Sequence, residues 1–285
     1  MASRRAQVRE TSSRRSAEGG DDDAAAWLRW AAALGYAACG IVYIAIGAIA
    51  AAVAVGLEER PAGAPRVMRM IEDQPFGKLM LVALSLGFLG YAALSLSGAF
   101  RDPEGRGRSL TGLLIRAADA VTGALYVALA VAAVRIVAAP SRQGGRIVEI
   151  WAAGVLALPG GAALLGGIGL ALLAAGGLLV YRARAEPFED ILDRRTLPPW
   201  LLRFLTIAAR FGTLARGLIL AISGVLVMRA AATRQPAQTG DIGDALSAVE
   251  TTPFGAWLLG VAALGFIAYG VYQLAKVRHR RVPIR

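Results

Sequence analysis

The chain has 285 residues, 56% of them hydrophobic, and the apolar residues lie in long blocks, which is typical of a membrane protein rather than a soluble domain. The formal net charge is +11, which would suit nucleic acid or anionic lipid. The single cysteine, Cys39, excludes a disulfide within one chain and a cysteine metal cluster. The single histidine, His279, lies in a basic tail, where we expect a solvated or lipid-facing role.

The chain begins with a polar segment, residues 1–26, in which arginine pairs precede Asp21-Asp22-Asp23. Such a segment cannot bury apolar surface, so we expect a disordered cytoplasmic tail. The acidic run separates Arg14-Arg15 from the apolar block that follows. We therefore expect the first apolar segment to remain as an uncleaved span.

Six apolar segments follow, and each reaches the roughly 20 residues that a helix needs to cross about 30 Å of hydrocarbon. Four contain no charged residue, and two are bracketed or interrupted by arginines; in chain order the six are 30–57, 79–100, 113–138, 150–181, 206–232 and 251–275. The sequence therefore predicts an all-α polytopic membrane protein with six transmembrane helices.

A two-helix unit occurs three times. In each unit a glycine in the first helix precedes a proline by 35 or 36 residues; the pairs are Gly40 and Pro75, Gly123 and Pro159, and Gly217 and Pro253. The units cover residues 27–101, 112–186 and 200–280. Because each unit contributes two spans, successive units enter the membrane in the same direction, which predicts three parallel helical hairpins with pseudo-threefold symmetry.

The connection inside each unit has its own pattern. We expect short helices at 65–73, 146–157 and 241–250, the last capped by Asp241. A proline then stands in the first turn of each second long helix, where its missing N–H costs nothing. These helix-start motifs are Pro75, Phe76 and Gly77, then Pro159, then Pro253, Phe254 and Gly255.

Basic residues are distributed unevenly between the two sides of the predicted topology. The N-terminal flank, the connections 101–116 and 182–216 and the tail from Lys276 hold 22 of the 31 basic residues. By the positive-inside rule this side, with both termini, is cytoplasmic. We expect a multi-pass protein of the inner (cytoplasmic) membrane that contacts anionic lipid headgroups and does not bind nucleic acid.

Two pairs of arginines occupy equivalent positions in the second and third units. Arg116 and Arg135 are 19 residues apart, as are Arg210 and Arg229, so along a helix each pair is separated by about 28 Å. This is close to the hydrocarbon thickness, and we expect all four to anchor spans at the membrane interfaces. Trp27 and Trp200, which begin Trp-Arg lead-in segments, suit the same interfaces.

Two ionisable residues lie deeper. Asp119 is one turn inside Arg116, and Arg216 is almost two turns inside Arg210. Charged groups below the headgroups are costly and are usually paired or face a cavity. Asp119 and Arg216 are the candidate buried ion pair; the alternatives are pairing of Asp119 with Arg116 and an Arg216 side chain that reaches cytoplasmic phosphates.

The repeated motifs resemble a known family. The first unit reads Gly35-Tyr36-Ala37-Ala38-Cys39-Gly40-Ile41-Val42-Tyr43 and then Gln74-Pro75-Phe76-Gly77, and the third reads Arg216-Gly217 and then Pro253-Phe254-Gly255. This pattern is similar to the bacterial membrane family catalogued as domain of unknown function 1206. The resemblance covers about 27–280 and implies a six-span protein without an established function.

No catalytic, cofactor or metal site is expected, because the chain has no Gly-rich phosphate loop, metal-ligand cluster or ATPase motif. An enzyme is therefore the least favoured class. We expect a structural, scaffolding or interaction role, with a second copy or another membrane protein as partner. The alternative is a small-solute transporter or channel around the pseudo-threefold centre, which would require polar residues such as Asp119, Arg216 and Ser223 to line a cavity there.

Overall fold

The computed structural model describes residues 30, 33–101, 110–138, 147–185 and 197–279, which contain helices and no strand. The expected tail 1–26 and Trp27 lie outside these residues. Six of the described helices are long and apolar enough to span a membrane, as predicted: the first span (Ala33–Ala54), α3 (Gly77–Arg101), α4 (Leu110–Ala138), α6 (Gly161–Ala185), α8 (Pro199–Thr233) and α10 (Gly255–His279).

In each unit one short helix precedes the second long helix, close to the expected position. The short helices are α2 (Ala64–Glu72), α5 (Ile147–Leu156) and α9 (Ile242–Glu250), and a 3₁₀ turn, η2 (Pro236–Gln238), precedes α9. The predicted cap of α9 is confirmed, since Asp241 Oδ1 accepts hydrogen bonds of 2.7 Å from Gly243 N and 3.1 Å from Asp244 N. Asp244 Oδ2 accepts from Asp241 N in return, which completes a capping box.

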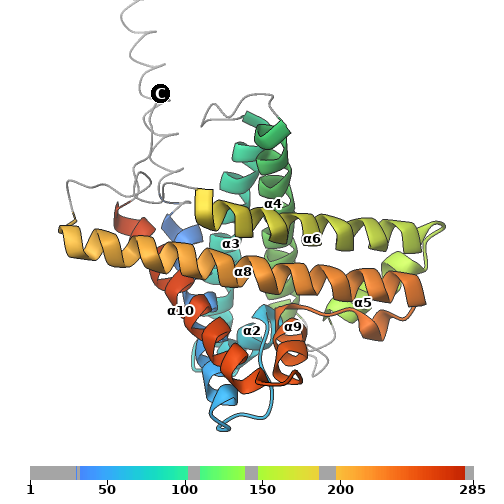
Figure 1. The fold of residues 1–285 in the computed structure, drawn as a ribbon. Coiled ribbons are helices and arrows are strands. Elements are labelled where there is room, and N and C mark those ends of the chain that lie inside the picture. Colours follow the sequence, from blue (N-terminus) through green and yellow to red (C-terminus); the bar gives the residue numbers. More distant parts are fainter. Residues whose placement is uncertain (1–29, 31–32, 102–109, 139–146, 186–196, 280–285) are drawn as a thin grey trace, which may run out of the picture.

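The most extensive pairings of the long helices join neighbouring units, although α8 also packs on α10 within the third unit. Helix α3 packs along α4, and α6 packs along α8, so the second helix of one unit pairs with the first helix of the next (Figure 1). The first span packs on α10, since a Cβ atom at Gly40 would lie 2.9 Å from Gly270 O. The pair that closes this series therefore joins the first and last spans.

The repeat glycine stands at each of these three contacts. Gly40 meets α10, Gly123 meets α3, and Gly217 lies against Gly176 of α6. A Cβ atom at Gly217 would lie 2.9 Å from Gly176 O, so only glycine allows this approach. The structure thus shows one kind of contact made three times, while the pseudo-threefold symmetry of the whole bundle stays a prediction.

The prolines occupy equivalent places, but not the ones expected. Each lies in the turn before its helix, and the helices begin two residues later, at Gly77, Gly161 and Gly255. Gly77 N donates to Gln74 O over 2.8 Å, and the residue after each proline has positive φ: 64° at Phe76, 76° at Gly160 and 65° at Phe254. Proline followed by positive φ is typical of a type II turn, so this turn, and not the first helical turn, requires the proline.

Buried and exposed apolar residues separate clearly. The largest buried cluster joins the first span, α2, α3, α4, α8, α9 and α10. Large apolar side chains also cover the outside of the bundle, among them Leu79, Phe100, Ile207, Trp257 and Leu264. An apolar outer surface of this extent suits contact with lipid.

Candidate functional site: a buried arginine among tyrosines

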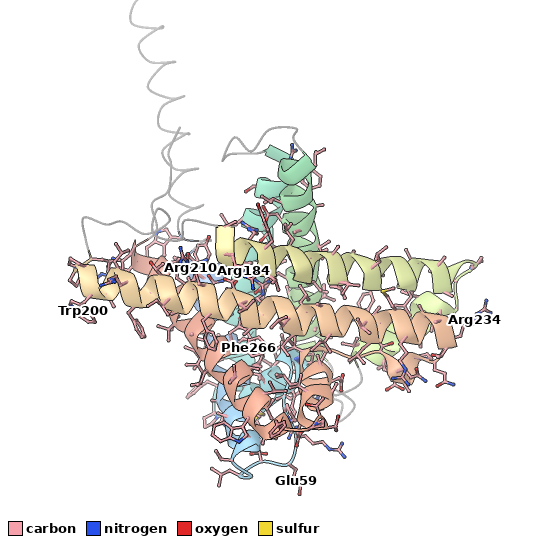
Figure 2. All side chains as sticks on the ribbon, in the orientation of Figure 1. Glu59, Arg184, Trp200, Arg210, Arg234 and Phe266 are labelled. Carbon is pink, nitrogen blue, oxygen red and sulfur yellow. The ribbon has the colours of Figure 1, made fainter. Side chains whose placement is uncertain are left out.

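Polar side chains from five of the six long helices meet in the interior of the bundle. This set, here called the central cluster, comprises Cys39 and Tyr43 of the first span, Tyr91 of α3, Tyr126 of α4, Arg216 of α8, and Tyr269 and Gln273 of α10. In Figure 2 the labelled Phe266, which stacks on Tyr43, lies where α10 passes beneath α8. The cluster is the most polar part of the bundle interior and is therefore the candidate functional site.

Arg216 is the charged member of the central cluster. Its side chain is buried, with 6% of the residue exposed, and Nη1 donates a hydrogen bond of 2.7 Å to the hydroxyl oxygen of Tyr269. The guanidinium also lies 5.6 Å from the ring centre of Tyr43 and 5.2 Å from that of Tyr269, the geometry of a cation–π contact. No ion pair joins Arg216 to a carboxylate within the described part of the chain, so its partners there are neutral.

Gln273 joins the other polar members. It is fully buried, and Nε2 lies 3.2 Å from Cys39 Sγ, 3.2 Å from Tyr269 OH and 3.3 Å from Tyr91 OH. The Cys39 sulfur is in turn 2.8 Å from Tyr126 OH. Gln273 Oε1 has no hydrogen-bond partner. One amide therefore links residues of the first span, α3 and α10, while one of its own polar atoms stays unsatisfied.

Aromatic rings fill the space around these polar atoms. Tyr43 packs edge-on against Tyr269, with ring centres 4.9 Å apart, and Tyr91 packs against Tyr126 at 4.3 Å. Phe88 covers the other side of Tyr126. Such ring pairs add packing energy of about 0.5–1.5 kcal/mol each beyond the area that they bury, so the cluster holds helices together as well as concentrating polar groups.

A small cavity of about 20 Å³ adjoins the central cluster. Cys39, Tyr43 and Tyr126 line one side of it, and Ala64 and Ile242, the first residues of α2 and α9, line another. A space of this size is enough for about one water molecule. It is far smaller than the roughly 300 Å³ or more of ordinary ligand sites.

Repeat positions explain how the cluster forms. Cys39 and Arg216 each stand one residue before the repeat glycine of their helices, so equivalent positions of two units meet in the same place. Tyr43 and Tyr126 each follow their repeat glycine by three residues. The signal was thus present in the sequence as tyrosines at equivalent repeat offsets, although spacing alone does not assign them a site. Gln273 is not repeated, because the equivalent position in the second helix of the first unit is a serine. No repeat pattern could therefore have indicated Gln273.

The predicted ion pair between Asp119 and Arg216 is wrong. Asp119 Oδ1 instead pairs with Arg182 Nη1 over 3.2 Å, with 19% and 16% of the two side chains exposed. Asp119 lies beside Gly98 of α3 and reaches α6, whereas Arg216 faces the first span and α10. The prediction failed because two residues at a similar depth in the membrane were assumed to be close together. The pairing of the helices instead places Asp119 and Arg216 at different helix contacts.

The predicted interface arginines differ in their surroundings. Arg116 donates 2.8 and 3.3 Å hydrogen bonds to Ala99 O and Phe100 O at the end of α3, and Arg135 lies 5.2 Å from the ring centre of Trp151. Arg210, Arg229 and Trp200 are exposed on α8, and Trp200 marks its beginning in Figure 2. Their role as anchors at the membrane interfaces stays a prediction.

Asp241 is the perturbed carboxyl outside the spans. Burial raises the pKa of the Asp241 carboxyl to about 6, and repulsion by the nearby Asp244 carboxylate adds to the rise. The hydrogen bonds from Gly243 N and Asp244 N oppose it. Among the described residues, no three His, Cys, Asp or Glu side chains gather as metal ligands.

Comparison with known proteins places these residues in a family. The model of the family described as Domain of Unknown Function (DUF1206) matches residues 34–102 and 211–280. These two regions are therefore similar to the DUF1206 family. They include six members of the central cluster, whereas Tyr126 comes from the unit between the two DUF1206 matches. The expected resemblance is therefore confirmed for the first and third units.

A similar protein extends the comparison to most of the chain. It is described as "Uncharacterized protein YxxB" of Bacillus subtilis (strain 168) and is 29% identical over 250 residues, which cover 88% of this chain and 90% of that protein. No solved structure matches the chain. The similarity to DUF1206 thus points to an uncharacterised family with membrane-type helices, and any function has to be argued from the structure.

Proposed function

We propose that the protein is an integral protein of the inner membrane, with both termini in the cytoplasm, and that its role is structural or scaffolding rather than enzymatic. The uneven distribution of basic residues supports this orientation. The exposed apolar side chains of all six long helices support a position in lipid.

The packing of the bundle interior is the observation that carries the structural role. The space between the helices is filled by the packed rings of the central cluster, and the adjoining cavity of about 20 Å³ has room for about one water molecule. A solute path would need a continuous opening, whereas a scaffold needs a rigid interior. The partners that suit it are anionic lipids, a second copy of the chain or another membrane protein.

The test combines a transport assay with crosslinking. Purified protein in vesicles should release no small sugar, amino acid or anion faster than protein-free vesicles. A photoreactive amino acid at Leu264, which is 61% exposed, should crosslink in native membranes to one defined protein, and the same group at buried Leu259 should not. Solute release would contradict the structural role, as would equal crosslinking from both positions.

A small-solute transporter is the second candidate, and Arg216 is the observation that favours it. Buried charges in membrane proteins are costly and often mark solute or ion paths. If the protein carries a small anion, vesicles should take up that anion, and Arg216→Gln should abolish the uptake. Uptake that is unchanged by Arg216→Gln would exclude a path through the central cluster.

A further inference from the structure

The two short helices α2 and α9 close one end of the bundle above the central cluster. Both helices lie below α8 in Figure 1, and their first residues, Ala64 and Ile242, line the small cavity beside Cys39 and Tyr126. Ala62, Met68 and Leu246 are fully buried. This end of the bundle is therefore covered by two short segments rather than by a long helix.

The contact between these segments is made by small residues. A Cβ atom at Gly243 would lie 2.5 Å from Gly63 N, and one at Gly63 would meet the Asp241 carboxylate. Within the described residues, no hydrogen bond or ion pair joins segment 61–72 to segment 239–250. Segment 239–250 is instead bonded to α8, since Ser223 Oγ donates to Asp241 O over 3.2 Å.

The closed arrangement also leaves polar atoms unsatisfied. Thr239 Oγ1, just before α9, and Arg69 Nε of α2 are buried without a hydrogen-bond partner. An unsatisfied buried polar atom costs about 1–3 kcal/mol, and exposure to water would remove that cost. Segments that open locally in folded proteins are those held by few stabilising contacts.

Arg216, which lies beneath this contact, carries a positive charge that no carboxylate of the described residues neutralises. Contacts of 2.7, 3.2 and 3.2 Å connect Arg216 through Tyr269 and Gln273 to Cys39 Sγ. The sulfur therefore lies within about 10 Å of the guanidinium, a range over which a charge still acts in dilute salt. The species that such a charge attracts is an anion.

We propose that the contact between the beginnings of α2 and α9 is a movable plug, and that its displacement admits small anions from that end of the bundle to Arg216 in the central cluster. The plug consists of residues 61–72 and 239–250. The proposal is independent of the structural role, because a bundle can hold an anion behind a plug without carrying it across the membrane.

Cys39 provides the test, since it is the single cysteine of the chain and lines the cavity. Protein in vesicles is treated with two methanethiosulfonates, one carrying a sulfonate and the other a trimethylammonium group. The Cys39 sulfur forms a disulfide with the thio group of the reagent, methanesulfinate leaves, and water takes the thiol proton. The rates are measured by mass spectrometry and divided by those of free cysteine.

The plug predicts labelling of the folded protein at a rate that changes little with low concentrations of denaturant, because local opening exposes little surface. Gly243→Ala should speed labelling about tenfold by forcing the segments apart. Gly154→Ala, whose Cβ atom would meet no atom within 4 Å, is the matched control and should not change the rate. Labelling that requires global unfolding would overturn the plug, and so would equal rates in the two variants.

The charge predicts a preference for the anionic reagent. After normalisation, the sulfonate should react about tenfold faster than the trimethylammonium reagent. Arg216→Gln should bring the ratio close to one. A ratio near one in the unaltered protein would overturn the anion site, whatever happens to the plug. Because no flux is measured, failure of either part leaves the vesicle and crosslinking test of the structural role unaffected.

Discussion

Arg216 of α8 and Tyr269 of α10 form a charge-assisted hydrogen bond of 2.7 Å in the interior of a six-helix bundle. The close approach of the two helices makes it possible, because a Cβ atom at Gly212 would lie 2.6 Å from Tyr269 N. Hydrogen bonds to a charged group contribute more to stability than neutral ones, about 1.5–3 kcal/mol. This bond is therefore a main contact between the two helices of the third unit.

Tyr269→Phe should destabilise the protein by about 1–3 kcal/mol, because it leaves the buried guanidinium short of a partner. Arg216→Met should cost less in the Tyr269→Phe background than in the unaltered protein, since the bond is already lost. Thermal unfolding of the four proteins in detergent measures the coupling. Additive losses would mean that the hydrogen bond contributes nothing net.

Asp119 and Arg182 should show coupling in a second cycle, whereas Asp119 and Arg216 should not. The 3.2 Å contact is partly buried, so we expect a coupling energy of about 1 kcal/mol or less for Asp119→Ala with Arg182→Ala. For Asp119→Ala with Arg216→Met, the losses should add within about 0.5 kcal/mol. Coupling in this second combination would restore the ion pair predicted from the sequence.

Phe76→Gly and Phe254→Gly should each stabilise the protein by about 1 kcal/mol in detergent. Both phenylalanines have positive φ, a conformation that costs ordinary residues about 1–3 kcal/mol and glycine very little. The middle unit already has Gly160 at this place, so Gly160→Phe is the reverse control and should lower the unfolding temperature. A loss of stability in the two glycine variants would show that the exposed rings contribute more than the turn costs.

Asp241 should make stability depend on pH. Its pKa in the folded protein is raised to about 6, above the value of about 3.9 for an unfolded aspartate. The folded state therefore binds the proton more tightly, and the stability from this group is full below about pH 4 and is lost as the pH rises to about 6. Asp241→Asn, which can still cap α9, should remove this part of the slope between pH 4 and 6. An identical slope in the variant would assign the dependence to other carboxyls.

Reporter fusions should place the loops on alternate sides. Fusions at residues 105 and 190 and at the C-terminus should report the cytoplasm, and fusions at 62, 143 and 238 should report the outside. An external C-terminus would exclude six spans with cytoplasmic termini.

The sequence was sufficient to predict the helices, but it was not sufficient to predict which helices lie beside one another. The lengths of the apolar segments predicted six long helices, and turn chemistry predicted α2, α5, α9 and the Asp241 cap, because these depend on residues close together in the chain. The partner of Arg216 depends on which helix lies beside α8. Repeat spacing does not contain that information, since a repeated hairpin can pair within its unit or with the next one.

The contact between Gly40 and α10 has a consequence for biosynthesis. The first span leaves the ribosome well before α10, the helix that packs along it, because the other described spans lie between the two in the chain. The glycine face of the first span must remain open to lipid, or be held by an insertion factor, until α10 has been made. A chain that stops before Gly255 would leave that face, with Cys39 and Tyr43, without its partner, and the nascent protein would be a target for membrane proteases.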